Sequence, residues 1–230
     1  MGVTDQNQLK HAAAEAAVAL IENGMIVGLG SGSTAAFAVE AIGRRVKSGL
    51  RIIGIPTSEK TADQAASLNI PLSDLGEHRT VDLTIDGADE VEIGSLSLIK
   101  GGGGNQLREK IVAAASSRFV VIVDSTKVVR QLGLQHPVPV EVVRFGWEVT
   151  SKRLDDLGIQ PKLRRHPDGS VFLTDDSNYI LDCACGPIAD ARKLQSSIDS
   201  IVGVVEHGLF IDMAEQAVVA GADGVTTLRR

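Results

Sequence analysis

Three short segments of this sequence combine glycine with residues that can bind anions or transfer protons. The first is Gly28-Leu29-Gly30-Ser31-Gly32-Ser33-Thr34, which lies between an apolar run and a helical pattern. Glycine lets the backbone approach a ligand closely, and the free amides at a helix start attract anions. The hydroxyls of Ser31, Ser33 and Thr34 add donors that suit a phosphate. The segment predicts an anion site, although a tight turn with a capping hydroxyl would use the same residues.

Two nucleotide-binding motifs do not fit this segment. A dinucleotide fingerprint has glycine where Ser33 stands and an acidic residue at the end of the following strand, which here ends in Pro56-Thr57-Ser58. A Walker A loop ends in Gly-Lys-Ser/Thr, and no such triplet follows. The segment therefore predicts neither a nicotinamide cofactor nor a P-loop nucleotide.

The second segment is Asp86-Gly87-Ala88-Asp89-Glu90, directly after an apolar stretch. Ligands of open parallel sheets bind beyond the carboxyl ends of the strands, so Asp86 and Asp89 should project toward a crevice there. Two carboxylates could exchange protons with the hydroxyls of a polyol or bind a divalent metal. The metal interpretation lacks a histidine or third carboxylate at matching spacing, so no metal is predicted. A polar turn capped by aspartate is the simpler alternative.

The third segment is Lys100-Gly101-Gly102-Gly103-Gly104, followed in the next helix by Glu109. Four ordered glycines are costly in chain entropy, which indicates a need for close backbone approach, and a lysine beside them can stabilise an oxyanion. The buried face of that helix is expected to hold Leu107, Ile111, Ala114 and Ala115. Glu109 lies off this face and should point toward the glycine loop. Alternatively, Glu109 only interacts favourably with the helix dipole and pairs with Lys110.

The three segments fall at strand-to-helix junctions of one predicted parallel sheet, so they should converge on one crevice. Together they supply what enediol chemistry needs. A base removes the proton beside a carbonyl, a cation stabilises the enediolate, and the proton returns to the neighbouring carbon. The sequence therefore predicts isomerisation of a small sugar phosphate, with no redox cofactor and no metal.

The elements that must position these segments alternate along the chain. Apolar strands are expected at residues 25–29, 51–55, 81–85 and 119–123. Helical patterns are expected at residues 7–21, 35–46, 58–68 and 105–115. Because the strands lack polar alternation, both of their faces should be buried. The fold class is therefore α/β, with a mostly parallel Rossmann-like sheet and helices on both faces.

The pattern changes after residue 132. Extended stretches are expected at residues 138–144, 161–165, 171–174, 179–184 and 204–209, with helices at 147–157 and 187–201. This order approximates β-α-β-β-α-β, and one of the three middle stretches must lie outside the four-stranded core. We predict an α/β catalytic domain of residues 1–132 and 208–230, to whose sheet the tail 217–230 returns. Residues 133–207 are predicted to form a smaller ferredoxin-like α+β domain that serves oligomerisation.

Composition narrows the possible partners. The 230 residues carry a formal net charge of −6 without a basic stripe, so neither nucleic acid nor an anionic membrane is expected to bind. No apolar run approaches the ~20 residues that span a bilayer, and the first residues do not resemble a signal peptide. A cytoplasmic protein is expected, or one in the plastid stroma if a transit peptide was removed. Cys183 and Cys185 should point to opposite faces of a strand and pack without bridging.

Taken together, the motifs resemble the A-type ribose-5-phosphate isomerases, in the same order and along essentially the whole chain. The matching segments are Gly30-Ser31-Gly32-Ser33-Thr34, Asp86-Gly87-Ala88-Asp89-Glu90, Lys100-Gly101-Gly102-Gly103, Arg108-Glu109-Lys110, Asp124-Ser125-Thr126-Lys127, Pro139-Val140-Glu141-Val142 and Gly203-Val204-Val205-Glu206-His207-Gly208-Leu209-Phe210. The resemblance implies interconversion of D-ribose 5-phosphate and D-ribulose 5-phosphate in the pentose phosphate pathway, or in the Calvin cycle of a photosynthetic source. It also implies a homodimer or homotetramer.

The resemblance also implies roles for individual residues. Glu109 would shuttle the proton between C1 and C2, and Lys100 would stabilise the enediolate. Asp86 and Asp89 would bind sugar hydroxyls and help to open the furanose ring. The remaining substrate-binding residues would be Ser31, Gly32, Ser33, Thr34, Gly87, Ala88, Gly101, Gly102, Gly103 and Lys127. Which loop takes the phosphate stays open.

Two other kinds of protein share related architectures. A non-catalytic sugar-phosphate sensor would normally add a DNA-binding module, and the chain has neither room nor a basic helix for one. A different enzyme of similar architecture, such as an amino-sugar-phosphate deaminase or an acyl-CoA transferase, is the other alternative. The deaminase would be expected to use a catalytic histidine. The five histidines fall outside the three segments and are expected at the surface or in packing: His11, His78, His136, His166 and His207.

Overall fold

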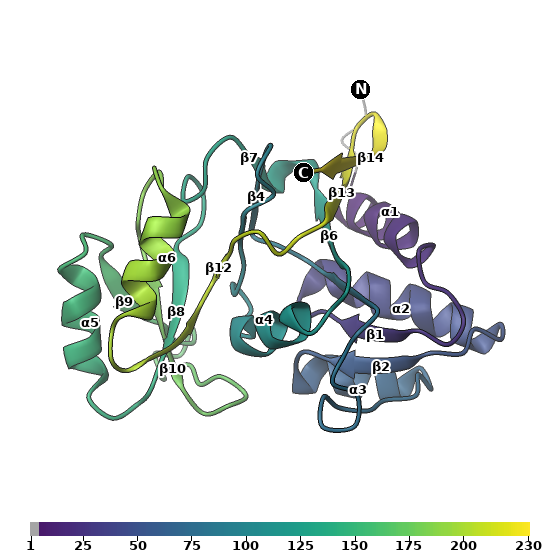
Figure 1. Ribbon diagram of the computed structural model, residues 1–230, viewed down its shortest axis with the longest axis horizontal. Coiled ribbons are helices and arrows are strands. Elements are labelled where there is room, and N and C mark those ends of the chain that lie inside the picture. The colour runs from purple at the N-terminus through teal and green to yellow at the C-terminus, as the bar shows by residue number, and fades with distance from the viewer. Residues whose placement is uncertain (1–4) are drawn as a thin grey trace.

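The computed structural model describes residues 5–230, and its main sheet has six strands in the order β14-β13-β6-β3-β1-β2 (Figure 1). The strands are β1 (Ile26–Leu29), β2 (Ile53–Pro56), β3 (Leu83–Asp86), β6 (Phe119–Asp124), β13 (Gln216–Gly221) and β14 (Gly224–Arg229). All neighbours pair in parallel except the β13–β14 hairpin. The predicted α/β class is confirmed, and the carboxyl-terminal tail returns to this sheet as expected.

Strand β6 shows why the sheet must be covered on both sides. Its Val120 and Ile122 belong to the core formed with α1 (Gln6–Val18), α2 (Ser33–Lys47) and α3 (Glu59–Ser67). Phe119, Val121 and Val123 point the other way, into a second core. Because side chains alternate along a strand, a continuous apolar run buries both faces. On that second side, α4 (Gln106–Ala114) adds Val112, which packs against Ile55 of β2.

A small separate sheet covers the second face of the main sheet and was not expected from the sequence. Its order is β12-β5-β4-β7, formed by β4 (Glu90–Glu92), β5 (Leu98–Ile99), β7 (Val128–Val129) and β12 (Leu209–Phe210). Strands of two or three residues are too short to produce a periodic signal. Fully buried Val91, Leu98 and Phe210 from this sheet pack against the main sheet.

The remaining strands form an antiparallel sheet in the order β11-β8-β10-β9. Its elements are β8 (Val138–Val142), α5 (Trp147–Asp155), β9 (Pro161–Leu163), β10 (Tyr179–Cys183), α6 (Ala191–Asp199) and β11 (Val204–His207). In chain order this is 4-1-3-2 with two helices, the predicted ferredoxin-like arrangement. The stretch 171–174 is the one outside the core, since it makes only a bridge between Val171 and Arg165.

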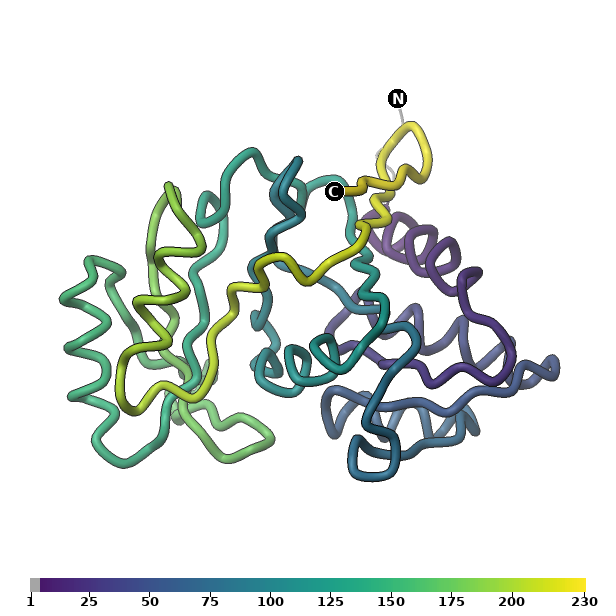
Figure 2. Tube along the Cα trace, in the orientation of Figure 1, coloured from purple at the N-terminus to yellow at the C-terminus, as the bar shows by residue number. Residues whose placement is uncertain are grey.

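Two details of this region differ from the sequence-based prediction or extend it. Helix α6 begins four residues later than expected, because the Asp190 carboxylate caps it by accepting from the Lys193 amide. The chain then returns from this sheet to the main one through β12 (Figure 2).

The boundaries of the two domains stay a prediction. Cys183 and Cys185 are both free thiols. Within residues 5–230, no helix is both long and apolar enough to cross a bilayer.

Candidate active site

One cavity collects nearly all the residues singled out by the sequence. It opens where β1 and β3 end and where the glycine loop 101–104 approaches them. Its lining residues are Gln6, Lys10, Ser31, Gly32, Ser33, Thr34, Gly87, Ala88, Asp89, Lys100, Gly101, Gly102, Gly103, Glu109 and Lys127. Of the residues expected at the site, only Asp86 is missing from the lining, because it lies fully buried at the end of β3.

Lys100 is the centre of the site. Its side chain is 3% exposed, and its Nζ lies 3.0 Å from Asp86 Oδ2 and 3.0 Å from Glu109 Oε2. The ammonium also donates to the carbonyl oxygen of Gly87 at 2.6 Å. A buried cation between two carboxylates is held in a fixed place, and the triad as a whole carries one excess negative charge when all three groups are ionised.

These charges shift the titration of the acidic and basic groups. Burial and the nearby Asp86 carboxylate raise the pKa of Glu109 to about 8, although Lys100 opposes the shift. Burial also raises the pKa of Asp86, again against the effect of Lys100. Burial opposes the charge of Lys100, but the carboxylates of Asp86 and Glu109 outweigh it and raise the lysine pKa. Lys100 therefore stays cationic, while Glu109 can exchange a proton near neutral pH, as a general base should.

The backbone around Asp86 fixes its carboxylate. Asp86 Oδ1 accepts from the amides of Ser31 at 3.1 Å and Gly87 at 2.7 Å. A Cβ at position 30 would lie 2.3 Å from the Asp86 carboxyl carbon, so only glycine fits there. The first glycine segment is thus packed directly against the acidic strand end, and the two segments form one structure.

The glycine loop is joined to the second acidic residue of the turn. The amide of Gly102 donates to Asp89 Oδ2 at 2.8 Å. A Cβ on Gly102 would approach the other Asp89 oxygen to 2.7 Å, which explains a glycine at this place. Asp89 is half-buried and lines the cavity, so its carboxylate is available to a bound ligand while the loop amide orients it.

Lys10 and Lys127 add positive charge to the cavity. Helix α2 begins at Ser33, after Gly32 with a φ of 96°, and free amides at a helix start attract anions. Lys10 Nζ donates to Ser33 Oγ at 3.0 Å, and Lys127 lines the same cavity. The hydroxyl of Ser31 turns inward, where it lies 2.7 Å from Thr57 Oγ1 and 2.8 Å from Ser58 Oγ. The Ser31 hydroxyl is therefore bonded within the protein and is not free to bind a ligand.

Sequence reasoning missed Gln6 and Lys10, which come from α1. They belong to no motif, but the order of helices and strands could have indicated them. Helix α1 precedes β1 and packs against β6 and β13. A helix that runs antiparallel to the strands it covers places its amino terminus at their carboxyl ends, where ligands bind. A polar residue in the first turns of this helix was therefore a candidate.

Two other expectations about the site were wrong in detail. The buried face of α4 is formed by Gln106, Glu109, Val112 and Ala113, whereas Ile111 is 49% exposed. Glu109 lies on the buried face because Lys100 compensates its charge there. In addition, the Lys100 loop follows β5 of the small sheet, not a strand of the parallel sheet. The convergence of the three segments was predicted, but one of them arrives by another route.

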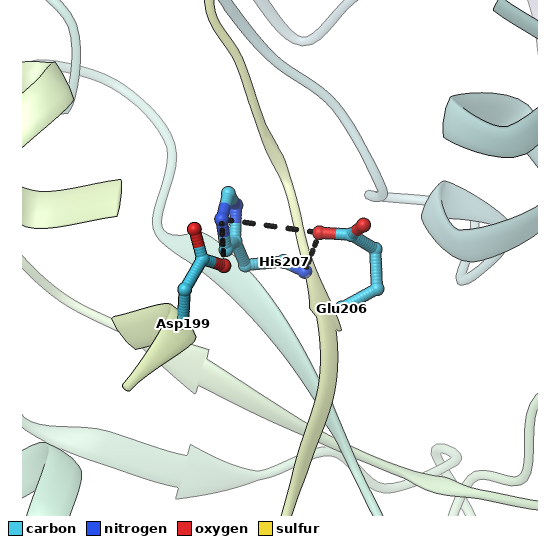
Figure 3. Close-up of side chains that lie close together, drawn as sticks. All are labelled: Asp199, Glu206 and His207. Carbon is cyan, nitrogen blue, oxygen red and sulfur yellow. Dashed lines mark hydrogen bonds and ion pairs between the residues drawn. The ribbon is translucent and has the colours of Figure 1, made fainter. Parts of the chain in front are cut away.

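A separate polar cluster resembles a metal site but lacks its chemistry. In the described part of the chain, Asp199, Glu206 and His207 are the group of potential ligands close enough to share an ion (Figure 3). Lys110 Nζ already lies 2.5 Å from Glu206 Oε1. The Leu209 amide donates to His207 Nδ1 at 3.1 Å, which leaves the ring proton on Nε2, 3.1 Å from Asp199 Oδ1. A lysine and a protonated Nε2 occupy the positions that a cation would need.

Comparisons of the chain with known proteins agree with one another. The sequence model of the family Ribose 5-phosphate isomerase A (phosphoriboisomerase A) matches residues 53–224. Ribose-5-phosphate isomerase A of Synechococcus sp. is 56% identical over 225 residues, which cover 97% of this chain and 98% of that protein. The protein of the same name from Gloeobacter violaceus is 56% identical over 224 residues and 97% of each chain.

Solved structures give the same result. The ribose 5-phosphate isomerase A of Methanocaldococcus jannaschii has a TM-score of 0.94 and 40% identity, covering 98% of this chain and all of that one. A D-ribose-5-phosphate isomerase in complex with phospho-erythronic acid has a TM-score of 0.95 and 34% identity, covering 99% of this chain and all of the other.

Proposed function

We propose, since this chain belongs to the ribose 5-phosphate isomerase A family, that it interconverts D-ribose 5-phosphate and D-ribulose 5-phosphate. The observation that carries the proposal is the buried Lys100 between Asp86 and Glu109, beside a cavity that Lys10 and Lys127 also line. This arrangement combines a base, an oxyanion partner and a phosphate site.

Glu109 is the proposed proton carrier. In the open-chain aldose, its carboxylate removes the proton from C2, and the electron pair of that bond forms the C1–C2 double bond of an enediolate with negative charge on O1. Glu109 then returns the proton to C1, while the O2 hydroxyl proton moves to O1 and the ketone forms at C2. No atom is gained or lost. A pKa of about 8 lets Glu109 both accept and release this proton near neutral pH.

Lys100 stabilises the charge that develops on the enediolate. Its ammonium is fixed before the reaction by Asp86, Glu109 and the Gly87 carbonyl, so little reorganisation is needed when the oxyanion appears. Asp86 lies beneath the cavity lining, so we assign it to holding Lys100. Asp89 lines the cavity and is the proposed group for sugar hydroxyls and for opening the furanose ring.

The phosphate is proposed to bind at the start of α2. The amides at the start of α2 and the ammonium of Lys10 converge at Ser33, and Lys127 adds a second positive charge to the cavity. Because a helix amino terminus with two lysines suits a dianion, we propose the first glycine segment as the phosphate loop.

The resemblance supports several finer statements. We propose a place in the pentose phosphate pathway, in the cytoplasm or in the plastid stroma of a photosynthetic source. We also propose catalysis without a metal, consistent with the lysine that fills the space between the two buried carboxylates. Assembly into a homodimer or homotetramer through residues 133–207 is proposed as well. The sensor alternative is not supported, since the full-length relatives carry the name of an isomerase.

A coupled assay tests the proposal directly. The full chain is incubated with ribose 5-phosphate after exhaustive treatment with EDTA, and formation of ribulose 5-phosphate is followed. We expect full turnover. A chain that binds ribose 5-phosphate but produces no ribulose 5-phosphate would overturn the proposed function, and activity that returns only with added metal would overturn the metal-free mechanism.

A further inference from the structure

The glycine loop poses a physical problem that the proposed mechanism does not solve. Residues 101–104 form a turn closed by the Gly104 amide and the Gly101 carbonyl at 3.0 Å. Four glycines have the greatest backbone freedom of any residues, so the loop needs external contacts to hold one conformation. Lys100 precedes this loop and Asp89 accepts a hydrogen bond from it. Lys100 is already held by Asp86, Glu109 and the Gly87 carbonyl, so whatever fixes the loop acts on Asp89.

The contact comes from the antiparallel sheet. Arg164, directly after β9, donates from Nη1 to the carbonyl oxygens of Gly101 at 2.9 Å and Gly102 at 3.2 Å. Its Nε and Nη2 pair with both carboxylate oxygens of Asp182 on β10. The guanidinium also stacks over the Phe172 ring, 5.6 Å from its centroid. The side chain is 13% exposed, so its orientation is determined on three sides.

A single peptide group joins Arg164 to the cavity. The carbonyl of Gly101 and the amide of Gly102 belong to the same peptide unit. Arg164 binds its oxygen at 2.9 Å, and its N–H donates to Asp89 Oδ2 at 2.8 Å. Hydrogen bonding to a carbonyl polarises the peptide and strengthens donation from its N–H. A cation at one end and a carboxylate at the other therefore fix the direction of this peptide group.

We propose that Arg164 is a positioning residue for the reaction, because through the Gly101–Gly102 peptide it holds Asp89 in the orientation that meets the sugar. The inference rests on the proposed function and extends it to a residue of the second sheet. Arginine is required at this position because its planar guanidinium binds a carboxylate and two carbonyls at once. A lysine has only a single point charge. Arg164 itself does not line the cavity.

Substitution of Arg164 by methionine tests this role against a matched neighbour. Arg165 is exposed, and its Nη1 donates to the Gly169 carbonyl of a surface turn, so Arg165→Met removes the same chemistry away from the loop. We expect Arg164→Met to lower kcat on the order of 10- to 100-fold, as misplacement of a reacting group does. KM should change less than about threefold, because Lys10 and α2 bind the phosphate independently. Arg165→Met should keep wild-type kinetics.

A double-mutant cycle separates positioning from a general loss of structure. If Arg164 acts through Asp89, the variant Arg164→Met/Asp89→Asn should be no slower than Asp89→Asn alone. Losses that multiply would overturn the inference, as would a kcat within about twofold of wild type in Arg164→Met. Arg164→Lys and Asp182→Asn provide the same comparison if the methionine variant does not fold, and both should lie between wild type and Asp89→Asn. Turnover by the wild-type chain in the same assay tests the proposed function separately.

Discussion

Replacing Glu109 by glutamine should abolish isomerisation and at the same time stabilise the fold. Glutamine keeps the shape of the side chain and an oxygen for Lys100, but it cannot take a proton from carbon. A positioned general base contributes about 10²- to 10⁴-fold, and Glu109 is the only one proposed for both proton transfers. We therefore expect kcat to fall by about 10³-fold or more.

The stabilisation follows from the titration of Glu109. Burial and Asp86 raise its pKa to about 8 in the folded protein, whereas an unfolded glutamate titrates near ~4.3. Between those values the folded state holds a proton that the unfolded state has released, so stability falls as the pH rises through this window. From about pH 5 to about pH 7.5 the loss amounts to about 3 kcal/mol. For a chain of this size that corresponds to roughly 6–12 °C in Tm, and Glu109→Gln should not show it.

Thermal unfolding at the two pH values measures this difference. Wild type, Glu109→Gln and a control, Glu22→Gln, are compared, since Glu22 is exposed and its carboxylate makes no hydrogen bond or ion pair in the described structure. The control should follow wild type, and the Tm of Glu109→Gln should rise relative to both as the pH increases. Near-normal turnover by Glu109→Gln would refute its role as the base. Equal pH dependence of Tm in all three proteins would refute the buried, proton-holding state of the carboxyl.

Three further predictions address the other parts of the site. The kcat/KM of the wild type should rise with pH and level off above an apparent pKa near 8, as Glu109 loses its proton in the free enzyme, and a profile that falls through this region would contradict that assignment. Lys100→Ala should lower kcat by about 10²- to 10³-fold and weaken binding much less; equal losses in both constants would make Lys100 a simple anchor. Lys10→Ala should raise KM and the inhibition constant of inorganic phosphate by about tenfold or more, with little change in kcat, and an unchanged phosphate affinity would move the phosphate away from α2.

Much of this site could be predicted because the residues that carry its chemistry lie in short segments of the sequence. A glycine-rich turn after a strand, an acidic strand end and a run of glycines after a lysine are local signals that need no knowledge of the distant fold. The correct side of α4 was not predictable from apolar spacing, because Glu109 is buried by pairing with Lys100 rather than by hydrophobicity. A helix pattern that counts only apolar residues places such a charged group in solvent.

The residues that were missed depend on contacts far apart in the sequence. Lys10 reaches the cavity from the first helix, and Arg164 reaches the glycine loop from the second sheet. Neither stands in a motif, and only the way the sheets pack brings them there. The small sheet containing β5 was missed for a different reason, since its two-residue strands carry no period of their own.

The most direct test of the account is a crystal structure of this chain with phospho-erythronic acid, a four-carbon phosphorylated acid whose carboxylate imitates the enediolate end of the substrate. We expect the carboxylate to lie within hydrogen-bond distance of Lys100 and Glu109, and the phosphate to lie between Lys10 and the start of α2. A ligand bound in the reverse direction, or with its carboxylate out of reach of Glu109, would contradict it.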